Sequence, residues 1–153
     1  MLFKFKLAVL FILILLSGCG SEFEILLHES RPVVIYWSEM SGTINSVNPD
    51  RTDEKTIIDL PNPAMDIDID VRRDRIFWAE YTGSEYHIGR VDLDGSGSVI
   101  VHSTVNSDFG PASISIDNSN GTIFWYEYRI SGSQKNIWKS DITVDTLIKE
   151  NWL

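Results

Sequence analysis

The chain has 153 residues and carries 13 Lys and Arg against 22 Asp and Glu, which gives a formal net charge of −9 at pH 7. This length favours a single domain, and a content of 43% hydrophobic and 11% aromatic residues excludes a disordered chain. The acidic balance argues against a nucleic-acid partner, because binding phosphates requires a basic face. The single cysteine, Cys19, excludes an internal disulfide and any site built from several thiolates.

The first 18 residues have the order of parts found in a secretory signal peptide. Lys4 and Lys6 form a basic region, and Leu7–Leu16 is an apolar run of 10 residues. A helix that spans a bilayer needs about 20 apolar residues, so the run is too short for a permanent anchor and fits a cleaved signal. We therefore expect a signal-peptide helix over residues 1–18.

The signal ends in the sequence Leu-Ser-Gly-Cys at positions 16–19, which resembles the lipobox of bacterial lipoproteins. This resemblance implies cleavage before Cys19, acylation of that residue, and a lipidated N-terminus and linker over 19–32. The membrane partner is then reached through the acyl chains, and the location is the bacterial cell envelope. Gly20 at the next position resembles an outer-membrane signal of Gram-negative lipoproteins. The alternative is an ordinary secretory signal that ends near a chance cysteine.

An aromatic core recurs three times in the rest of the chain. It reads IYWSE at 35–39, IFWAE at 76–80 and IFWYE at 123–127, with successive tryptophans 41 and 47 residues apart. Each core is followed by a segment that an isoleucine opens, a polar turn and a short apolar run. The last two cores are preceded by strand-like segments that close on Asp70 and Asp117. Four β-rich segments in about 40–50 residues are typical of one propeller blade, so we predict an all-β fold.

These repeats resemble the YWTD, or class B, repeats of the low-density lipoprotein receptor family. The segment IGRVDLDGSG at 88–97 is the closest match, while the aromatic cores carry Glu where the family has Asp. Related bacterial sequences belong to the TolB-like group of six-bladed propellers. The resemblance covers residues 33–153 and implies a partial six-bladed β-propeller with about three four-stranded blades: an incomplete blade at 33–59, and blades at 63–102 and 111–150.

The residues that mark the repeat all have a structural interpretation. Each tryptophan and its aromatic neighbour can bury roughly 150–250 Å² between blades. The glutamate of each core can accept hydrogen bonds from indole or backbone N–H groups and so tie one blade to the next, and an Asp-Gly pair suits a tight turn. The residues of this structural set are Tyr36, Trp37, Glu39, Asp70, Phe77, Trp78, Glu80, Asp94, Gly95, Asp117, Phe124, Trp125 and Glu127.

Three blades do not close a six-bladed ring, and an open ring exposes apolar area and strand edges. The sequence leaves three explanations open. The chain is a truncated gene product, which we favour because it stops where the next repeat would begin; or two copies form a homodimer that closes a ring of six blades; or a partner covers the open face.

Asp66 and Asp68 are the candidates for chemistry. With Asp70 they lie on one side of a predicted strand, and the family resemblance places that strand next to the central channel. Acids at this place could bind a cation, as in lactonase-type propellers. In the alternative interpretation both reach solvent at the channel wall. The corresponding positions of the next repeat are Ser113 and Ser115, so the acids are not part of the repeated frame.

The remaining patterns do not assemble a site. Alternating polar residues at 92, 94, 96 and 98 resemble the start of an EF-hand loop, but the twelfth position is Ser103 instead of Glu, so a turn is favoured. The sequon at 120–122 is likewise interpreted as a turn. The histidines have no metal-ligand spacing, and no serine lies in a Gly-x-Ser-x-Gly motif, so we expect no catalytic set and no cofactor. These histidines are His28, His87 and His102.

The sequence therefore favours a non-catalytic, lipid-anchored propeller module of the cell envelope that binds a protein, peptide or glycan. One alternative is a lactonase-like, metal-dependent hydrolase that uses Asp66 and Asp68. Another is a remnant without independent activity. Because one propeller fold carries many functions, the choice between them depends on the sites that the fold presents.

Overall fold

The computed structural model describes residues 32–105, 109–129 and 135–152. The expected signal-peptide helix, the expected acylation site Cys19 and His28 lie outside these residues. Within the described ranges the chain forms strands, turns and irregular segments, and none of them contains a helix that could cross a bilayer.

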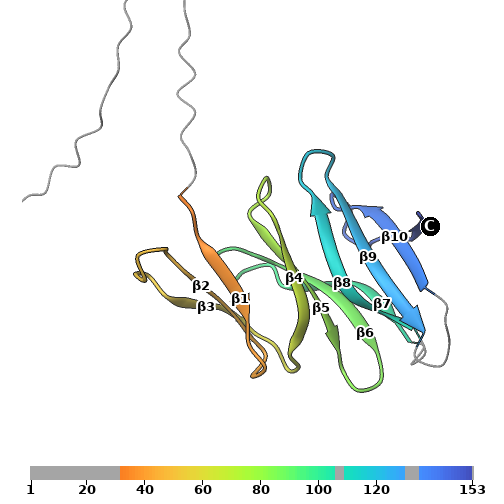
Figure 1. Ribbon diagram of the computed structural model, residues 1–153, viewed down its shortest axis with the longest axis horizontal. Coiled ribbons are helices and arrows are strands. Elements are labelled where there is room, and N and C mark those ends of the chain that lie inside the picture. The colour runs from red at the N-terminus through yellow and green to blue at the C-terminus, as the bar shows by residue number, and fades with distance from the viewer. Residues whose placement is uncertain (1–31, 106–108, 130–134, 153) are drawn as a thin grey trace, which may run out of the picture. The chain divides into compact units, whose positions relative to one another are not determined.

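In the described residues, eleven strands form three antiparallel sheets that follow one another along the chain and stand side by side (Figure 1). The first sheet contains β1 (Ile35–Ser38), β2 (Thr43–Val47) and β3 (Lys55–Asp59). The second contains β4 (Ala64–Asp70), β5 (Arg75–Tyr81), β6 (Tyr86–Asp92) and β7 (Val99–Thr104). The third contains β8 (Phe109–Asp117), β9 (Thr122–Arg129), β10 (Lys135–Asp141) and β11 (Glu150–Asn151).

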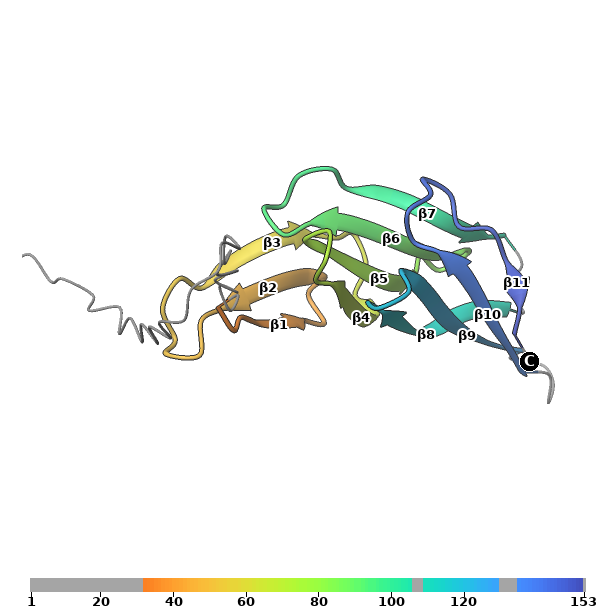
Figure 2. The ribbon, with the colours of Figure 1, turned by 90° about the horizontal axis from the view of Figure 1, so that it is seen from above.

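The three aromatic cores fall on β1, β5 and β9, which are therefore corresponding strands. In the second and third sheets an inner strand, β4 or β8, precedes the core strand and pairs with it. The first sheet has the order β1-β2-β3, and the part of the chain that the structure describes contains no counterpart of these inner strands in it. Figure 2 shows β1, β4 and β8 along one side of the sheets, and β3 and β7 along the other.

The hydrophobic core lies between consecutive sheets. We call the face of a sheet that looks toward the preceding sheet its near face, and the opposite face its far face. Trp78 on the near face of the second sheet packs in a cluster with Ile44 of the first. Phe77, the preceding residue, points to the far face and packs in a cluster with Trp125 of the third sheet. The two tryptophans are each 1% exposed, because side chains alternate between the faces of a strand and both faces are covered.

The outermost strand of the third sheet differs from the expected one. The sequence predicts a strand over the apolar run TLIKE at 146–150, whereas β11 contains only Glu150–Asn151. Leu147 instead turns inward, is 4% exposed, and donates its backbone N–H to the carbonyl of Val101 at 2.8 Å. This contact reaches the second sheet, so burial between the sheets takes the place of pairing along β10.

Candidate functional site

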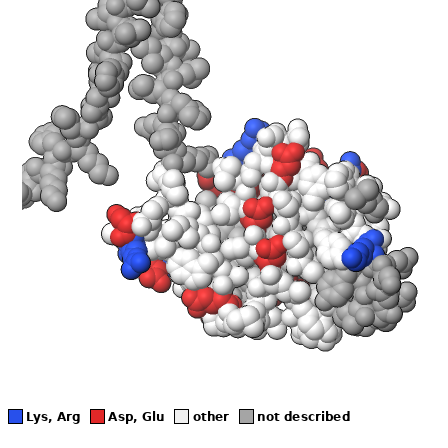
Figure 3. Space-filling view, in the orientation of Figure 1, with Lys and Arg blue, Asp and Glu red and all other residues white. Residues whose placement is uncertain are grey.

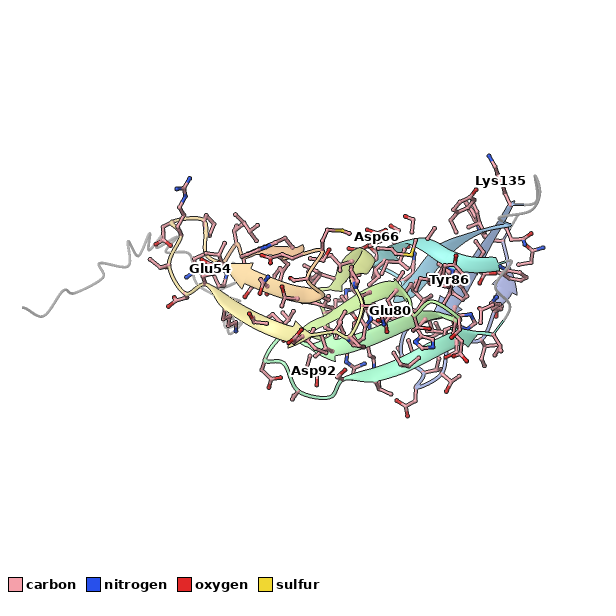
Figure 4. The ribbon with its side chains drawn as sticks, turned by 90° about the horizontal axis from the view of Figure 1, so that it is seen from below. Glu54, Asp66, Glu80, Tyr86, Asp92 and Lys135 are labelled. Carbon is pink, nitrogen blue, oxygen red and sulfur yellow. The ribbon has the colours of Figure 1, made fainter. Side chains whose placement is uncertain are left out.

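The two candidate acids lie where the inner strand β4 runs beside the inner strand β8 (Figure 4). Asp66 Oδ2 accepts hydrogen bonds from Ser113 Oγ and from the backbone N–H of Ile114, both at 2.9 Å. Asp68 Oδ2 accepts the backbone N–H of Ile116 at 2.6 Å. These N–H groups belong to the edge strand of the third sheet. The carboxylates therefore join two sheets by acting as acceptors for an unpaired strand edge.

The remaining oxygens of these acids are also engaged. Asp66 Oδ1 accepts the N–H of Ile67 at 3.0 Å, and Asp68 Oδ1 accepts the N–H of Ile69 at 2.7 Å. Both acids are half-buried, and Figure 3 shows acidic side chains over the middle of the face where β4 runs. Both acids therefore keep part of their surface in solvent and also hold the edge strand of the next sheet, a role that the sequence did not predict. Among the described residues, no three His, Cys, Asp or Glu side chains are grouped so that they could hold a metal ion.

Two of the three glutamates of the aromatic cores accept an indole N–H group inside their own sheet. Trp37 Nε1 donates to Glu39 Oε1 at 3.1 Å, and Trp125 Nε1 donates to Glu127 Oε1 at 3.0 Å. These two bonds join residues two positions apart on one strand face. The sequence had led us to expect bonds that link one sheet to the next, and these two bonds do not do so.

The middle core lacks this bond. Trp78 Nε1 and Glu80 Oε2 are buried without a hydrogen-bond partner within the described part of the chain. Glu80 Oε1 instead lies 3.5 Å from Nδ1 of His87, whose Nε2 is 3.0 Å from Glu85 Oε2. His87 thus lies between two carboxylates and does not form part of a convergent ligand set.

Glu127 is the centre of a buried polar cluster between the second and third sheets, and it is 2% exposed. Lys149 Nζ lies 2.6 Å from its Oε1, and Trp138 Nε1 donates to its Oε2 at 2.9 Å. His102 on β7 of the second sheet places Nε2 3.8 Å from Oε1, and its ring packs at a tilt against Trp125 with ring centroids 5.4 Å apart. This is the glutamate that does reach a neighbouring sheet.

Burial alone would raise the pKa of Glu127. The interactions with His102, Lys149 and Trp125 outweigh burial and lower the pKa to about 2, so the carboxylate is charged at neutral pH. Sequence reasoning found Glu127 but missed Lys149 and Trp138. Neither has a counterpart in the other repeats, so no periodic signal identified them.

Aspartates at strand ends close the turns. Asp70 is fully buried, accepts the backbone N–H groups of Arg72 and Arg73, and forms an ion pair with Arg73 at 3.1 Å. Asp117 accepts the backbone N–H groups of Ser119 and Asn120. Both are local turn contacts.

The EF-hand-like segment is a closed turn. Asp94 accepts both the N–H and the hydroxyl of Ser96, at 2.8 and 2.6 Å, and these bonds lower its pKa. Gly95 has φ of +89°, and a Cβ at this position would lie 2.7 Å from the carbonyl oxygen of Ile57 in the first sheet. Glycine is required here both by the backbone conformation and by the close approach.

A hollow of about 420 Å³ opens at the rim of the second sheet, between the β4–β5 turn and the β6–β7 turn. Arg75 Nε and Asp92 Oδ1 form an ion pair across it at 3.2 Å, and the N–H of Leu93 donates to the carbonyl of Asp74 at 2.7 Å. The hollow therefore has a fixed backbone and side chains of both charges. Its lining residues are Arg73, Asp74, Arg75, Asp92, Leu93 and Asp94.

No family model matches the sequence, and no curated protein matches it. Many solved structures are similar to it, among them the following three. A chain in the nidogen/laminin complex matches with a TM-score of 0.61 and 20% identity, over 77% of this chain and 43% of that chain. The putative TolB of Agrobacterium tumefaciens matches with a TM-score of 0.56 and 15% identity, over 78% of this chain and 45% of that chain. Hydrazine synthase of Kuenenia stuttgartiensis matches with a TM-score of 0.61 and 20% identity, over 77% of this chain and 33% of that chain.

The chain thus spans less than half the length of each of these solved chains. At 15–20% identity the likeness establishes the fold and nothing more specific. Together with three consecutive antiparallel sheets, it confirms the prediction of an all-β chain that forms part of a β-propeller.

Proposed function

We propose that this chain is a non-catalytic, lipid-anchored β-propeller module of the bacterial cell envelope, which binds a protein, peptide or glycan partner at its rim. The observation that carries the proposal is the charged hollow lined by the turns at 73–75 and 92–94. The aromatic cores and the inner acids already serve to hold the sheets together. The rim hollow is a concave surface lined mainly by charged side chains.

The properties of the hollow suit recognition. Its volume of about 420 Å³ is within the range of about 300–1,000 Å³ that ligand sites occupy. Arg73 uses Nη1 for Asp70 and Arg75 uses Nε for Asp92, so each guanidinium has further N–H groups that can donate to carboxylate or sugar oxygens. The second oxygens of Asp92 and Asp94 can accept from amide or hydroxyl groups. Loops on a rigid sheet frame bind with little loss of conformational entropy.

The interpretation of Asp66 and Asp68 as metal ligands of a hydrolase has less support. Each of the four carboxylate oxygens accepts a backbone N–H, so a cation would compete with bonds that join two sheets. Equilibrium dialysis of the intact chain against Ca²⁺ and Zn²⁺, repeated with Asp66→Asn, tests this directly. Stoichiometric uptake that the substitution abolishes would favour the hydrolase over the binding module.

The anchor is tested separately, in cells that process bacterial lipoproteins. Labelled palmitate should be incorporated into the wild-type chain, and the chain should partition with membranes. Cys19→Ser should abolish both results, whereas Ser21→Ala, a nearby change outside the lipobox, should leave them intact. Release of the unlabelled wild-type chain into the soluble fraction would refute the anchor without bearing on the rim.

The binding surface is tested by charge reversal at the hollow. Arg75→Glu should weaken co-purification of envelope partners with the anchored chain, because it removes a donor and repels acidic groups. Arg51→Glu is the matched control, since Arg51 lies in an exposed turn of the first sheet. Equal recovery of the same partners with wild type, Arg75→Glu and Arg51→Glu would contradict binding at this hollow.

A further inference from the structure

The two outermost sheets each present one face that no other described sheet covers. On the far face of the third sheet, Phe124 and Ile137 are half-buried and line an apolar hollow of about 130 Å³, and Trp152 packs edge-on against Phe124. On the near face of the first sheet, Trp37 is half-buried and Ile35 is 49% exposed.

The contact between the second and third sheets shows what such faces bind. The positions that correspond by strand register on the two far faces are Phe77 and Phe124, Ala79 and Tyr126, Ile88 and Ile137, and Arg90 and Lys139. In the second sheet Phe77, Ala79 and Ile88 are at most 1% exposed, because the near face of the third sheet covers them. The far face of the third sheet therefore has the residues of a sheet-binding surface.

We propose that a second copy of this chain covers that surface. The near face of its first sheet, marked by Ile35 and Trp37, packs on the far face of the third sheet, marked by Phe124 and Ile137. Trp37 then takes a position equivalent to that of Trp125, which is 1% exposed between the second and third sheets. The contact is head-to-tail, since it joins two different faces.

The inner strands favour the first sheet of a copy over a complete four-stranded sheet as the occupant. Asp66 and Asp68 on the far side of β4 accept N–H groups from the inner strand of the next sheet. The corresponding positions on β8 are Ser113 and Ser115. Within the described residues, the first sheet has no inner strand that could donate such N–H groups. A carboxylate facing it would lose water without gaining a donor, whereas a serine hydroxyl costs much less to cover.

Charge is matched as well. Between the second and third sheets, Arg90 forms an ion pair of 2.9 Å with Asp145 in the β10–β11 connection. The counterpart of Arg90 on the third sheet is Lys139, which is 39% exposed and lies 3.5 Å from Glu150 of its own sheet. The counterpart of that connection on the first sheet is the β2–β3 turn, which carries three acids, Asp50, Asp53 and Glu54, against one base, Arg51. Figure 4 shows Glu54 on the first sheet, at the opposite end from Lys135 on the third.

Sedimentation equilibrium of the intact lipidated chain in density-matched detergent tests the proposal. We expect at least twice the protomer mass at about 10 μM. A mass that rises further with concentration would indicate open, head-to-tail oligomers formed through the same contact, and this result would also support the proposal. Ile137→Arg and Ile35→Arg should each give single protomers. The control Val71→Arg, in a turn of the middle sheet and 48% exposed in the wild type, should associate like the wild type. A wild type that sediments as one protomer overturns the proposal.

A mixing experiment tests the head-to-tail arrangement. Tagged Ile137→Arg has an intact near face, and untagged Ile35→Arg has an intact far face, so the mixture should form a complex that neither variant forms alone. Near-ultraviolet circular dichroism confirms that both variants are folded. Failure of the mixture to associate above the level of each variant alone would refute the arrangement. Both experiments leave Cys19 and the rim hollow unchanged, so their failure is independent of the proposed function.

Discussion

The charge of Glu127 should contribute measurably to stability, and Glu127→Gln removes it with little change in shape. The carboxylate is 2% exposed and lies 2.6 Å from Lys149 Nζ, with Trp138 Nε1 at 2.9 Å. The amide keeps one acceptor oxygen, but it places an NH₂ group among donors and leaves the ammonium without its counter-charge. Breaking one partner of a buried ion pair is strongly destabilising.

The magnitude follows from the pKa of Glu127, which is lowered from its ordinary value of 4.5 to about 2. A difference of one pKa unit corresponds to 1.36 kcal/mol, so the charged form is worth about 3 kcal/mol to the folded state. Because the folded pKa is the lower one, this stability is fully present above pH 4.5. It is lost as the pH falls from 4.5 toward 2.

Urea unfolding followed by tryptophan fluorescence measures the effect, with wild type and Glu127→Gln compared from pH 7 to pH 2. We expect a difference of about 3 kcal/mol at pH 7 that shrinks toward zero near pH 2. Glu39→Gln is the matched control, since Glu39 accepts the same indole bond at 3.1 Å but is exposed; its effect should stay within about 0.5 kcal/mol. A pH-independent difference between wild type and Glu127→Gln would refute the reasoning.

Three further substitutions test the contacts within the chain and the proposed contact between copies. Asp68→Ala removes the acceptor of the Ile116 N–H bond at 2.6 Å and should cost about 1.5–3 kcal/mol in urea unfolding. Gly89→Ala places a Cβ 2.1 Å from the Trp78 ring; it should destabilise by about 1–3 kcal/mol or more and shift the tryptophan fluorescence. Ser115→Asp should leave thermal unfolding of the single protomer unchanged and weaken self-association in sedimentation, so an unaltered assembly would count against the interface.

The all-β architecture was predictable because its signal is repeated. The aromatic cores recur at 41 and 47 residues, and each contributes a tryptophan large enough to fill the space between two sheets. The outermost strand of the third sheet was not predictable in the same way. An apolar run such as TLIKE satisfies a strand pattern locally, but Leu147 packs in the core cluster between two sheets, and these contacts exist only once the two sheets have met.

The roles of the polar residues depend on neighbours that the sequence does not place side by side. Asp66 and Asp68 are spaced as strand residues that share a face, which is all that the pattern MDIDID indicates. Their partners are backbone N–H groups some 48 positions later, and any residue except proline supplies such a donor. A sequence pattern therefore identifies the acids but not what they bind.

The three copies of the Trp-x-Glu pair show how sheet register changes the chemistry of one motif. The residue opposite Glu127 across the β9–β10 pair is Asn136, whereas the residue opposite Glu80 across the β5–β6 pair is His87. The His87 ring lies 3.5 Å from Glu80 Oε1, so the carboxylate contacts its cross-strand neighbour instead of the indole. Trp78 Nε1 and Glu80 Oε2 both have no hydrogen-bond partner in the described residues, although the Trp78 ring is buried as deeply as that of Trp125. Burial of the ring and bonding of its N–H are thus set independently, the first by the adjacent sheet and the second by the adjacent strand.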